Sequence, residues 1–225
     1  MDQMKRFAVF YAPRDGAFST AAAAWLGWDA ERGRAVPQPE VAGIAALTAE
    51  PRRYGFHGTL KPPFRLAAGV GPQDLAQSVA RLAEGMHPVA IPALRMAELE
   101  GFLALIPDGD TTPLQAMAAG IVRALDGFRA PLSEAEIARR SPARLSPRQR
   151  ELLAAYGYPY VMDEFRFHLT LSGRLAGPDA ASLRAAAGRR FARLLPIPFR
   201  LEDICLFGEA ADGRFHMMHR YPLSA

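Results

Sequence analysis

The sequence predicts an α+β protein built from two similar halves, and three observations lead to this prediction. A short motif, Phe-His-x-Thr-Leu, occurs twice, at residues 56–60 and 167–171. Each copy is followed by a helix pattern that begins at a proline, and then by an Ile-Pro pair, at residues 91–92 and 197–198. The two motif histidines are 111 residues apart and the two Ile-Pro pairs 106 apart. Repeats at a nearly constant offset are typical of duplicated structural units.

The length and composition fit one globular domain. The chain has 225 residues, of which 50% are hydrophobic and 22% charged, a balance that allows a buried core. We therefore expect a single bilobal domain over residues 1–225. An N-terminal motif lobe should span about residues 1–126 and a C-terminal motif lobe about 165–225, with a helical insertion at 127–164.

The expected elements follow from the apolar patterns along the chain. Strands are predicted where β-branched and aromatic residues alternate or cluster, and helices where apolar residues recur at helical spacing. The predicted strands are residues 6–13, 54–61, 89–94, 102–106, 164–174, 198–207 and 214–221, the second of them ended by Pro62–Pro63. The predicted helices are residues 17–28, 72–86, 112–126 and 178–195, and prolines break the insertion into helical pieces.

Composition excludes several classes of protein. The single cysteine, Cys205, rules out an intrachain disulfide and a zinc site built from several cysteines. No apolar run approaches the ~20 residues that span a bilayer, and the N-terminal apolar stretch is too short for a secretory signal. We expect a cytoplasmic protein without a membrane association. The net charge of +4 suits a small anionic substrate, and the absence of a dense basic run disfavours a nucleic-acid partner.

The repeated motif places two polar side chains on one face of each strand. Residues i and i+2 of a strand point the same way, so His57 shares a face with Thr59, and with Lys61 if the strand continues that far. In the second copy, His168 and Thr170 share a face in the same manner. The apolar residues between them point to the opposite side. If a pseudo-twofold axis relates the halves, the two polar faces meet in one cleft.

Two imidazoles and two hydroxyls in one cleft suit phosphoester chemistry. A neutral histidine can take a proton from the attacking water or hydroxyl, while a protonated one donates to the leaving oxygen. The threonine hydroxyls can donate hydrogen bonds to the phosphate oxygens that are not transferred. This chemistry needs no metal or cofactor, and none is expected. A single strand histidine is more often a packed residue than a catalyst, but two in matched contexts favour catalysis.

Other candidates carry weaker signals. Tyr11 on the first strand could face the cleft or the core. Arg129, Arg139 and Arg140 in the insertion could form an anion clamp, although solvated surface charges are the more common alternative. His216 and His219 lie on opposite faces of a strand, which argues against a shared metal.

The paired His-x-Thr-Leu motifs resemble the two-histidine (2H) phosphoesterase superfamily. The resemblance implies two lobes of antiparallel sheet with outer helices and an active-site cleft between them. The segments PRRYGFH (51–57), LKPPF (60–64), WLG (25–27), FRAPL (128–132), GYPYV (157–161) and FRFH (165–168) look like the branch associated with bacterial phosphonate metabolism. Gly58 stands where this branch would have alanine, a small change on the side of the core.

The resemblance implies an enzyme that opens a cyclic phosphodiester. In the branch associated with phosphonate metabolism, the implied substrate is a small phosphorylated ribose cyclic phosphate. Two alternatives stay open. One is an RNA 2′,3′-cyclic phosphodiesterase on the same fold, and the other is a module that binds a phosphorylated ligand without turning it over. The sequence does not assign the acid and base roles between the two histidines.

Overall fold

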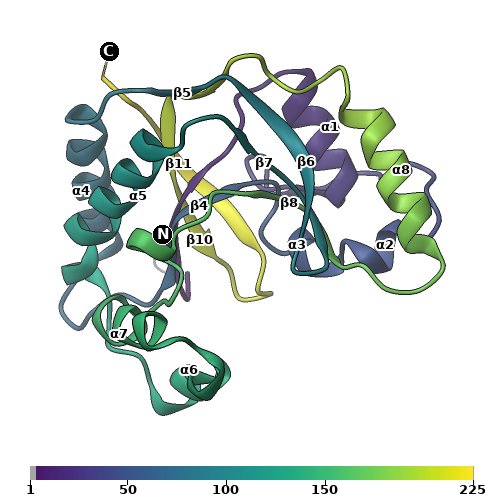
Figure 1. The fold of residues 1–225 in the computed structure, drawn as a ribbon. Helices are drawn as coiled ribbons and strands as arrows, with labels where there is room; N and C mark the ends of the chain where they lie inside the picture. Colours follow the sequence, from purple (N-terminus) through teal and green to yellow (C-terminus); the bar gives the residue numbers. More distant parts are fainter. Residues whose placement is uncertain (1–3, 225) are drawn as a thin grey trace.

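A seven-stranded antiparallel sheet forms the centre of the molecule in the computed structural model, which describes residues 4–224 (Figure 1). The strand order is β11-β10-β1-β4-β8-β7-β6. These strands are β1 (Phe7–Tyr11), β4 (Gly58–Phe64), β6 (Ala93–Leu99), β7 (Phe102–Asp108), β8 (Leu169–Arg174), β10 (Asp203–Glu209) and β11 (Phe215–Pro222). Two small sheets pair β2 (Trp28–Asp29) with β3 (Arg34–Ala35), and β5 (Val89–Ile91) with β9 (Phe199–Leu201). The predicted α+β class and antiparallel sheet are confirmed.

Four long helices build the main core against one face of the sheet. They are α1 (Ala17–Leu26), α4 (Pro72–Glu84), α5 (Thr112–Ala124) and α8 (Asp179–Phe191), close to the helices predicted from apolar spacing. Their buried side chains form one hydrophobic cluster with Val9, Leu60, Leu169 and other alternate strand residues. In Figure 1, α4 and α5 lie beside β10 and β11, whereas α1 and α8 lie toward β6, β7 and β8. Burial of this apolar surface is the main stabilising contribution to the fold.

The opposite face of the sheet carries a second, smaller cluster. Ala8, Phe10 and Ala12 alternate with the core residues of β1 and pack with Phe207 and Phe215 from β10 and β11. The helices of the main core do not contribute to this cluster. This face is therefore free to carry the polar side chains of the motif strands.

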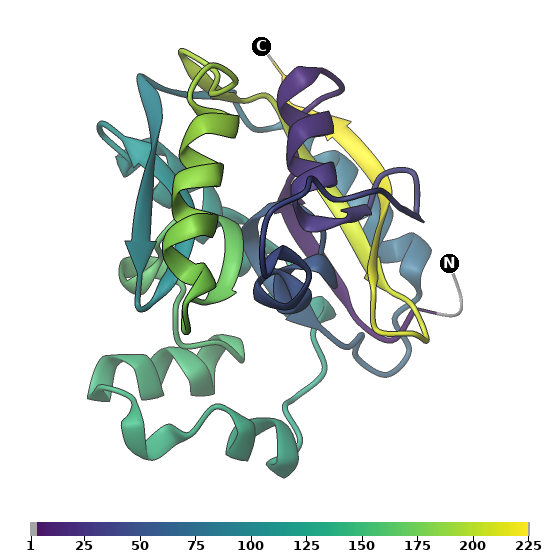
Figure 2. The same ribbon diagram turned by 90° about the vertical axis from the view of Figure 1, so that its right-hand side faces the viewer.

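The insertion between α5 and β8 is helical, as expected. It contains α6 (Glu134–Arg139) and α7 (Pro147–Tyr156), with short 3₁₀ turns at Asp126–Phe128, Pro142–Arg144 and Met162–Glu164. Serines cap both helices, since Ser133 and Ser146 each accept a hydrogen bond from a backbone amide of the first turn. Figure 2 shows the two helices at one end of the molecule, below α8.

The order of elements repeats along the chain, but the boundary differs from the lobes that we expected. The first series is β1, α1, β4, α4, β5, β6, and the second is β7, α5, β8, α8, β9, β10. The last strand of each series crosses over: β6 pairs with β7, and β10 pairs with β1. Lobes at residues 1–126 and 165–225 are thus incorrect for the sheet, because β6 and β7 lie beside β8, and β10 and β11 lie beside β1. The duplication itself stays a prediction.

Several element boundaries also differ from the predictions. Strand β4 continues through Pro62 and Pro63 to Phe64. The prolines are tolerated for two reasons. Strand β4 pairs with β8 at Gly58 alone, and its register with β1 shifts between Phe7 and Phe10. Strand β8 begins at Leu169, five residues later than predicted, since the preceding segment has no strand partner.

Two short helices replace part of the predicted loop. They are α2 (Ile44–Leu47) and α3 (Ala49–Arg52), which precede the first motif, and α3 packs on β8.

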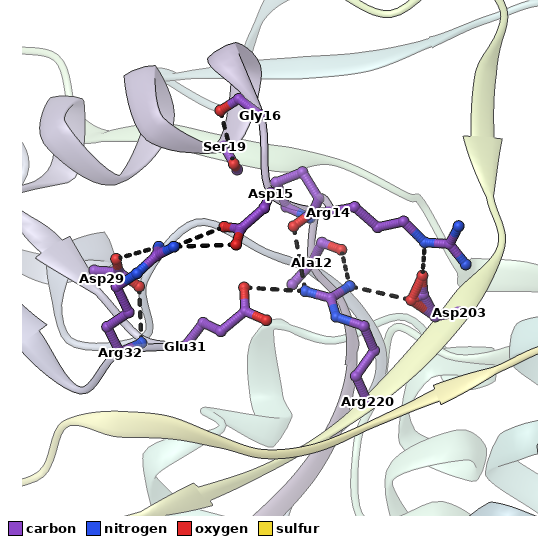
Figure 3. Close-up of polar contacts among 11 residues, drawn as sticks. Ala12, Arg14, Asp15, Gly16, Ser19, Asp29, Glu31, Arg32, Asp203 and Arg220 are labelled. Atoms are coloured by element: carbon purple, nitrogen blue, oxygen red, sulfur yellow. Dashed lines mark hydrogen bonds and ion pairs between the residues drawn. The ribbon is translucent and has the colours of Figure 1, made fainter.

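A group of charged side chains connects the loop after β1 to the last two strands, β10 and β11 (Figure 3). Buried Asp203 on β10 accepts hydrogen bonds from Arg14 and Arg220. Arg220 on β11 also donates to the Ala12 carbonyl at 2.9 Å and contacts Glu31. These bonds hold the loop after β1 in place, and with it the strand that carries Phe10.

Among the described helices, none has the length and apolar character needed to cross a bilayer.

Candidate active site

The two motifs lie side by side because their strands pair with each other. Gly58 of β4 is the partner of Leu169 of β8 in antiparallel register. In such a register His57 lies opposite Thr170, and Thr59 lies opposite His168. The two histidines and the two threonines therefore form a quartet around a single backbone pair, with the twofold arrangement that the repeated motif predicts.

The ring of His57 is fixed on three sides. Its Nδ1 lies 2.9 Å from the Gly55 carbonyl, and its Nε2 lies 3.2 Å from Oγ1 of Thr59. A carbonyl can only accept, so Nδ1 carries the proton and Nε2 is left as the acceptor, to which the Thr59 hydroxyl donates. The ring also packs against Phe10, with centroids 4.0 Å apart. Burial, with a smaller contribution from the charge of His168, lowers the pKa of His57 to about 4. His57 is thus a neutral base near pH 7.

His168 repeats this geometry on the second strand. Its Nδ1 donates to the Arg166 carbonyl at 2.8 Å, again the carbonyl two residues before the histidine. Its Nε2 is thereby left as the acceptor in the neutral ring, as in His57. The ring lies next to Phe102, with centroids 5.6 Å apart. Each motif therefore fixes the tautomer of its histidine through its own backbone.

A cavity of about 960 Å³ opens beside the quartet. Its wall includes His57, Thr59 and Thr170, while His168 lies adjacent and is not a wall residue. Pro62, Pro63 and residues of the insertion between Arg129 and Tyr158 also line it. The volume is far larger than one phosphate group needs, so the cavity can hold a small molecule of which a phosphoester is one part.

Lys61 reaches the cavity, but it is more constrained than strand alternation implies. Its side chain is 2% exposed, and Nζ donates to the Val122 carbonyl at 3.2 Å. The Asp126 carboxylate lies 3.8 Å from Nζ. Burial lowers the pKa of Lys61 to about 8, with Asp126 acting in the opposite direction. The amine is thus held at the end of α5. It can act on the site through its positive charge, but the side chain is not free to move toward a ligand.

Tyr11 requires a correction. It packs edge-on against Phe167 and Phe199 in the main core and is not part of the cavity wall. Because side chains alternate along β1, Tyr11 shares the face of Val9, and the neighbouring Phe10 faces the site instead. Burial raises the pKa of its hydroxyl, as expected of a core tyrosine.

Several wall residues were not among the predicted site residues, and three of them lie near the motifs. Phe10 packs on His57, Tyr54 lies 5.7 Å from the same ring, and Ser172 lines the cavity two residues after Thr170. Strand alternation places Ser172 on the motif face, but no role was predicted for it. The Ser172 hydroxyl accepts a hydrogen bond from the Leu103 amide at 2.9 Å and donates to the Gly173 carbonyl, which points to a structural role.

Arg129, Arg139 and Arg140, the insertion arginines considered for an anion clamp, all line the cavity, but their contacts differ. Arg129 is held by the Asp126 carboxylate at 2.9 Å and by the Ala155 carbonyl. Arg139 and Arg140 have no carboxylate within ion-pair distance in the part of the chain that the structure describes.

His216 packs edge-on against Trp28, and residues 4–224 contain no group of three or more potential metal-ligating His, Cys, Asp or Glu side chains.

The family comparison covers most of this site. The model described as "Protein of unknown function (DUF1045)" matches residues 59–216. This chain belongs to that family. The matched region includes β4, the insertion and β8, and it begins two residues after His57.

Two curated proteins are similar over nearly the whole chain. A protein named ribose 1,5-bisphosphate phosphokinase PhnN from Janthinobacterium sp. (strain Marseille) is 34% identical over 99% of this chain. A protein of the same name from Laribacter hongkongensis (strain HLHK9) is 35% identical over 92% of it. The chain spans only about half the length of these relatives, 52% and 49% respectively. Their name therefore describes proteins with a large part that has no counterpart here.

Solved structures resemble this chain only distantly. A crystal structure titled as a phosphoesterase has a TM-score of 0.43 at 16% identity, covering 99% of this chain and all of that one. The structure of LigT from E. coli complexed with phosphate has a TM-score of 0.41 at 13% identity, with 99% of both chains covered. Scores below 0.5 assign neither an activity nor a substrate to this chain.

Proposed function

We propose that this chain is a phosphoesterase that opens a cyclic phosphodiester, with His57 and His168 as general base and general acid. The observation that supports this most directly is the Gly58–Leu169 pair, since both His-x-Thr motifs lie on these neighbouring strands around it. Both histidines have Nδ1 bound to their own backbone, so both offer Nε2 for proton transfer.

The geometry supports a specific order of events. Neutral His57 takes a proton from the attacking water through Nε2, from which the Thr59 hydroxyl is displaced. The water oxygen then forms a bond to phosphorus while the ring P–O bond breaks. His168, protonated, donates its proton to the leaving oxygen. Thr59 and Thr170 hydroxyls donate to the two non-bridging oxygens, where the negative charge must be stabilised. The products are a phosphate monoester and a free hydroxyl.

We propose further that the substrate is a small phosphorylated ribose cyclic phosphate. This rests on the size of the cavity and on the similarity to proteins whose name refers to a ribose bisphosphate. That name also refers to a kinase, but this chain spans only about half the length of those proteins, and we propose no kinase activity for it.

A phosphorus NMR assay tests the proposal. Chelator-treated protein is incubated in parallel with ribose 1,2-cyclic phosphate 5-phosphate and with a nucleoside 2′,3′-cyclic phosphate. Opening of the ribose compound without added metal is the expected result. Opening of the nucleotide alone would instead indicate an RNA 2′,3′-cyclic phosphodiesterase. No turnover of either compound would favour a binding module. Activity that returns only with an added divalent cation would contradict the metal-independent mechanism.

A further inference from the structure

The cavity wall is more basic than one phosphodiester requires. Its basic side chains are Lys5, Arg6, Arg53, Lys61, Arg65, Arg129, Arg139, Arg140 and Arg174, and its acidic ones are Glu50, Glu100, Glu136 and Glu209. A cyclic phosphodiester carries a single negative charge, so the excess of positive charge points to a second anionic group on the ligand.

Most of these basic groups are already occupied. Arg6 and Arg53 share Glu209, Arg65 pairs with Glu136, and both Lys61 and Arg129 contact Asp126. Lys5 donates to the Ala211 carbonyl. Among the described residues, Arg139, Arg140 and Arg174 of the wall form no ion pair within 4 Å. Arg139 donates through Nε to the Ala135 carbonyl at 3.3 Å, whereas the described residues accept no hydrogen bond from the side chains of Arg140 and Arg174. Arg140 and Arg174 are therefore the wall arginines most available to bind an anion.

Arg140 is the one of the three whose guanidinium stacks on an aromatic ring among the described residues. Its guanidinium lies over the ring of Tyr158, 4.7 Å from the centroid, and its side chain is only half-exposed. This stacking holds the planar group in one orientation and leaves its N–H donors free at the edges. Arg139 is the adjacent residue on the wall.

The Arg140–Tyr158 pair lines the same cavity as His57 and Tyr54. The ring of Tyr54 lies 5.7 Å from that of His57. Arg174, at the end of β8, the strand that carries Thr170, lines this cavity as well.

From these contacts we propose that Arg140, supported by Tyr158 and with Arg139 and Arg174 on the same cavity wall, forms a second anion site for a phosphate monoester on the same substrate molecule. This inference rests on the proposed function and deepens it. It assigns the residues that would recognise the phosphate monoester of the proposed substrate. A guanidinium binds such a dianion through two parallel hydrogen bonds, which gives both affinity and orientation.

The test compares Arg140→Gln with Arg144→Gln as a matched control. Arg144 is an exposed arginine of the same insertion outside the cavity wall, so its replacement makes the same change of charge. Steady-state constants are measured for ribose 1,2-cyclic phosphate with and without a 5-phosphate. We expect Arg140→Gln to raise KM for the 5-phosphorylated compound by roughly 10- to 100-fold, as for the loss of a charged hydrogen bond, without affecting the other compound. Arg144→Gln should change neither.

A binding measurement separates this inference from the proposed function. Ribose 5-phosphate, which lacks the cyclic ester, is titrated into wild type and both variants, with thermal melting as a check of folding. Loss of binding in Arg140→Gln alone supports the second site even if no cyclic ester is turned over. Equal losses on both cyclic compounds, or unchanged constants, would overturn it. A selective loss on a dinucleotide ending in a 2′,3′-cyclic phosphate would also overturn it, in favour of an RNA backbone.

Discussion

The ring of Phe167 occupies the space that a side chain at Gly58 would need. A Cβ built on Gly58 would overlap two ring atoms of Phe167 and would lie 3.1 Å from Leu169 Cδ2. Gly58 and Leu169 form the backbone pair at the centre of the site. The glycine therefore allows the two motif strands to approach closely, and it is more than the minor departure from alanine that the family resemblance suggested.

Replacement of Gly58 by alanine should lower the stability of the protein. Forcing a methyl group into a packed core typically costs about 1–3 kcal/mol. The free energy of unfolding, from urea denaturation, measures the effect. Gly58→Ala combined with Phe167→Leu should recover part of the loss, because the smaller side chain vacates the space. A single variant as stable as wild type would show that Phe167 moves without cost.

Removal of either motif histidine should nearly abolish turnover. We expect His57→Ala and His168→Ala each to reduce kcat by about 10²–10⁴-fold, the usual contribution of general acid–base catalysis. The exposed His87, which lies outside the cavity wall, provides the control variant His87→Ala with unchanged activity. Either motif variant that folds and retains full turnover would refute the mechanism.

The two threonines should matter through their hydroxyls. Thr59→Ala and Thr170→Ala should each reduce kcat by ~10²–10³-fold if each supplies one donor to the phosphate oxygens. Thr59→Ser and Thr170→Ser keep the hydroxyl and should retain most of the activity. Serine variants as impaired as the alanine variants would assign the threonines to packing instead.

The pH profile should report the low pKa of His57. A base acts when deprotonated, so kcat/KM should fall as the pH drops below about 4 and should stay level above it on the acidic side. Phe10→Leu exposes the ring to water and should move this limb upward, toward the ordinary histidine pKa of about 6.5. An acidic limb that is already near 6.5 in wild type would contradict the burial of His57 in the free enzyme.

Titration of Lys61 should weaken substrate binding on the basic side of the pH profile. Its pKa of about 8 means that the positive charge near the site is lost as the pH rises through that value. Phosphate affinity should therefore weaken, and KM should rise above pH 8. Lys61→Met lacks this charge at every pH, so its KM should be high and should not change across this range. An identical basic limb in Lys61→Met would assign the titration to another group.

Much of the local structure could be predicted from the sequence. Apolar spacing identified α1, α4, α5 and α8, and alternation placed Thr59 and Thr170 on the face opposite Leu60 and Leu169. These features depend on neighbours within a few positions of the chain, where backbone geometry fixes the direction of each side chain. The repeat likewise identified both histidines without any knowledge of the fold.

The tertiary structure decided what the repeat could not. The pairing of β10 with β1 places Phe7 beside Gly208, two residues far apart in the sequence, and no local pattern predicts it, whereas β6 and β7 form a local hairpin. The same pairing decides that Phe10 and not Tyr11 faces His57, and the end of α5 ties Lys61 to Val122. The sequence by itself identified the candidate residues of the site. Only packing between distant segments determined the low pKa of His57 and the arginines left free in the cavity, because burial and ion pairing arise from contacts that the linear chain does not contain.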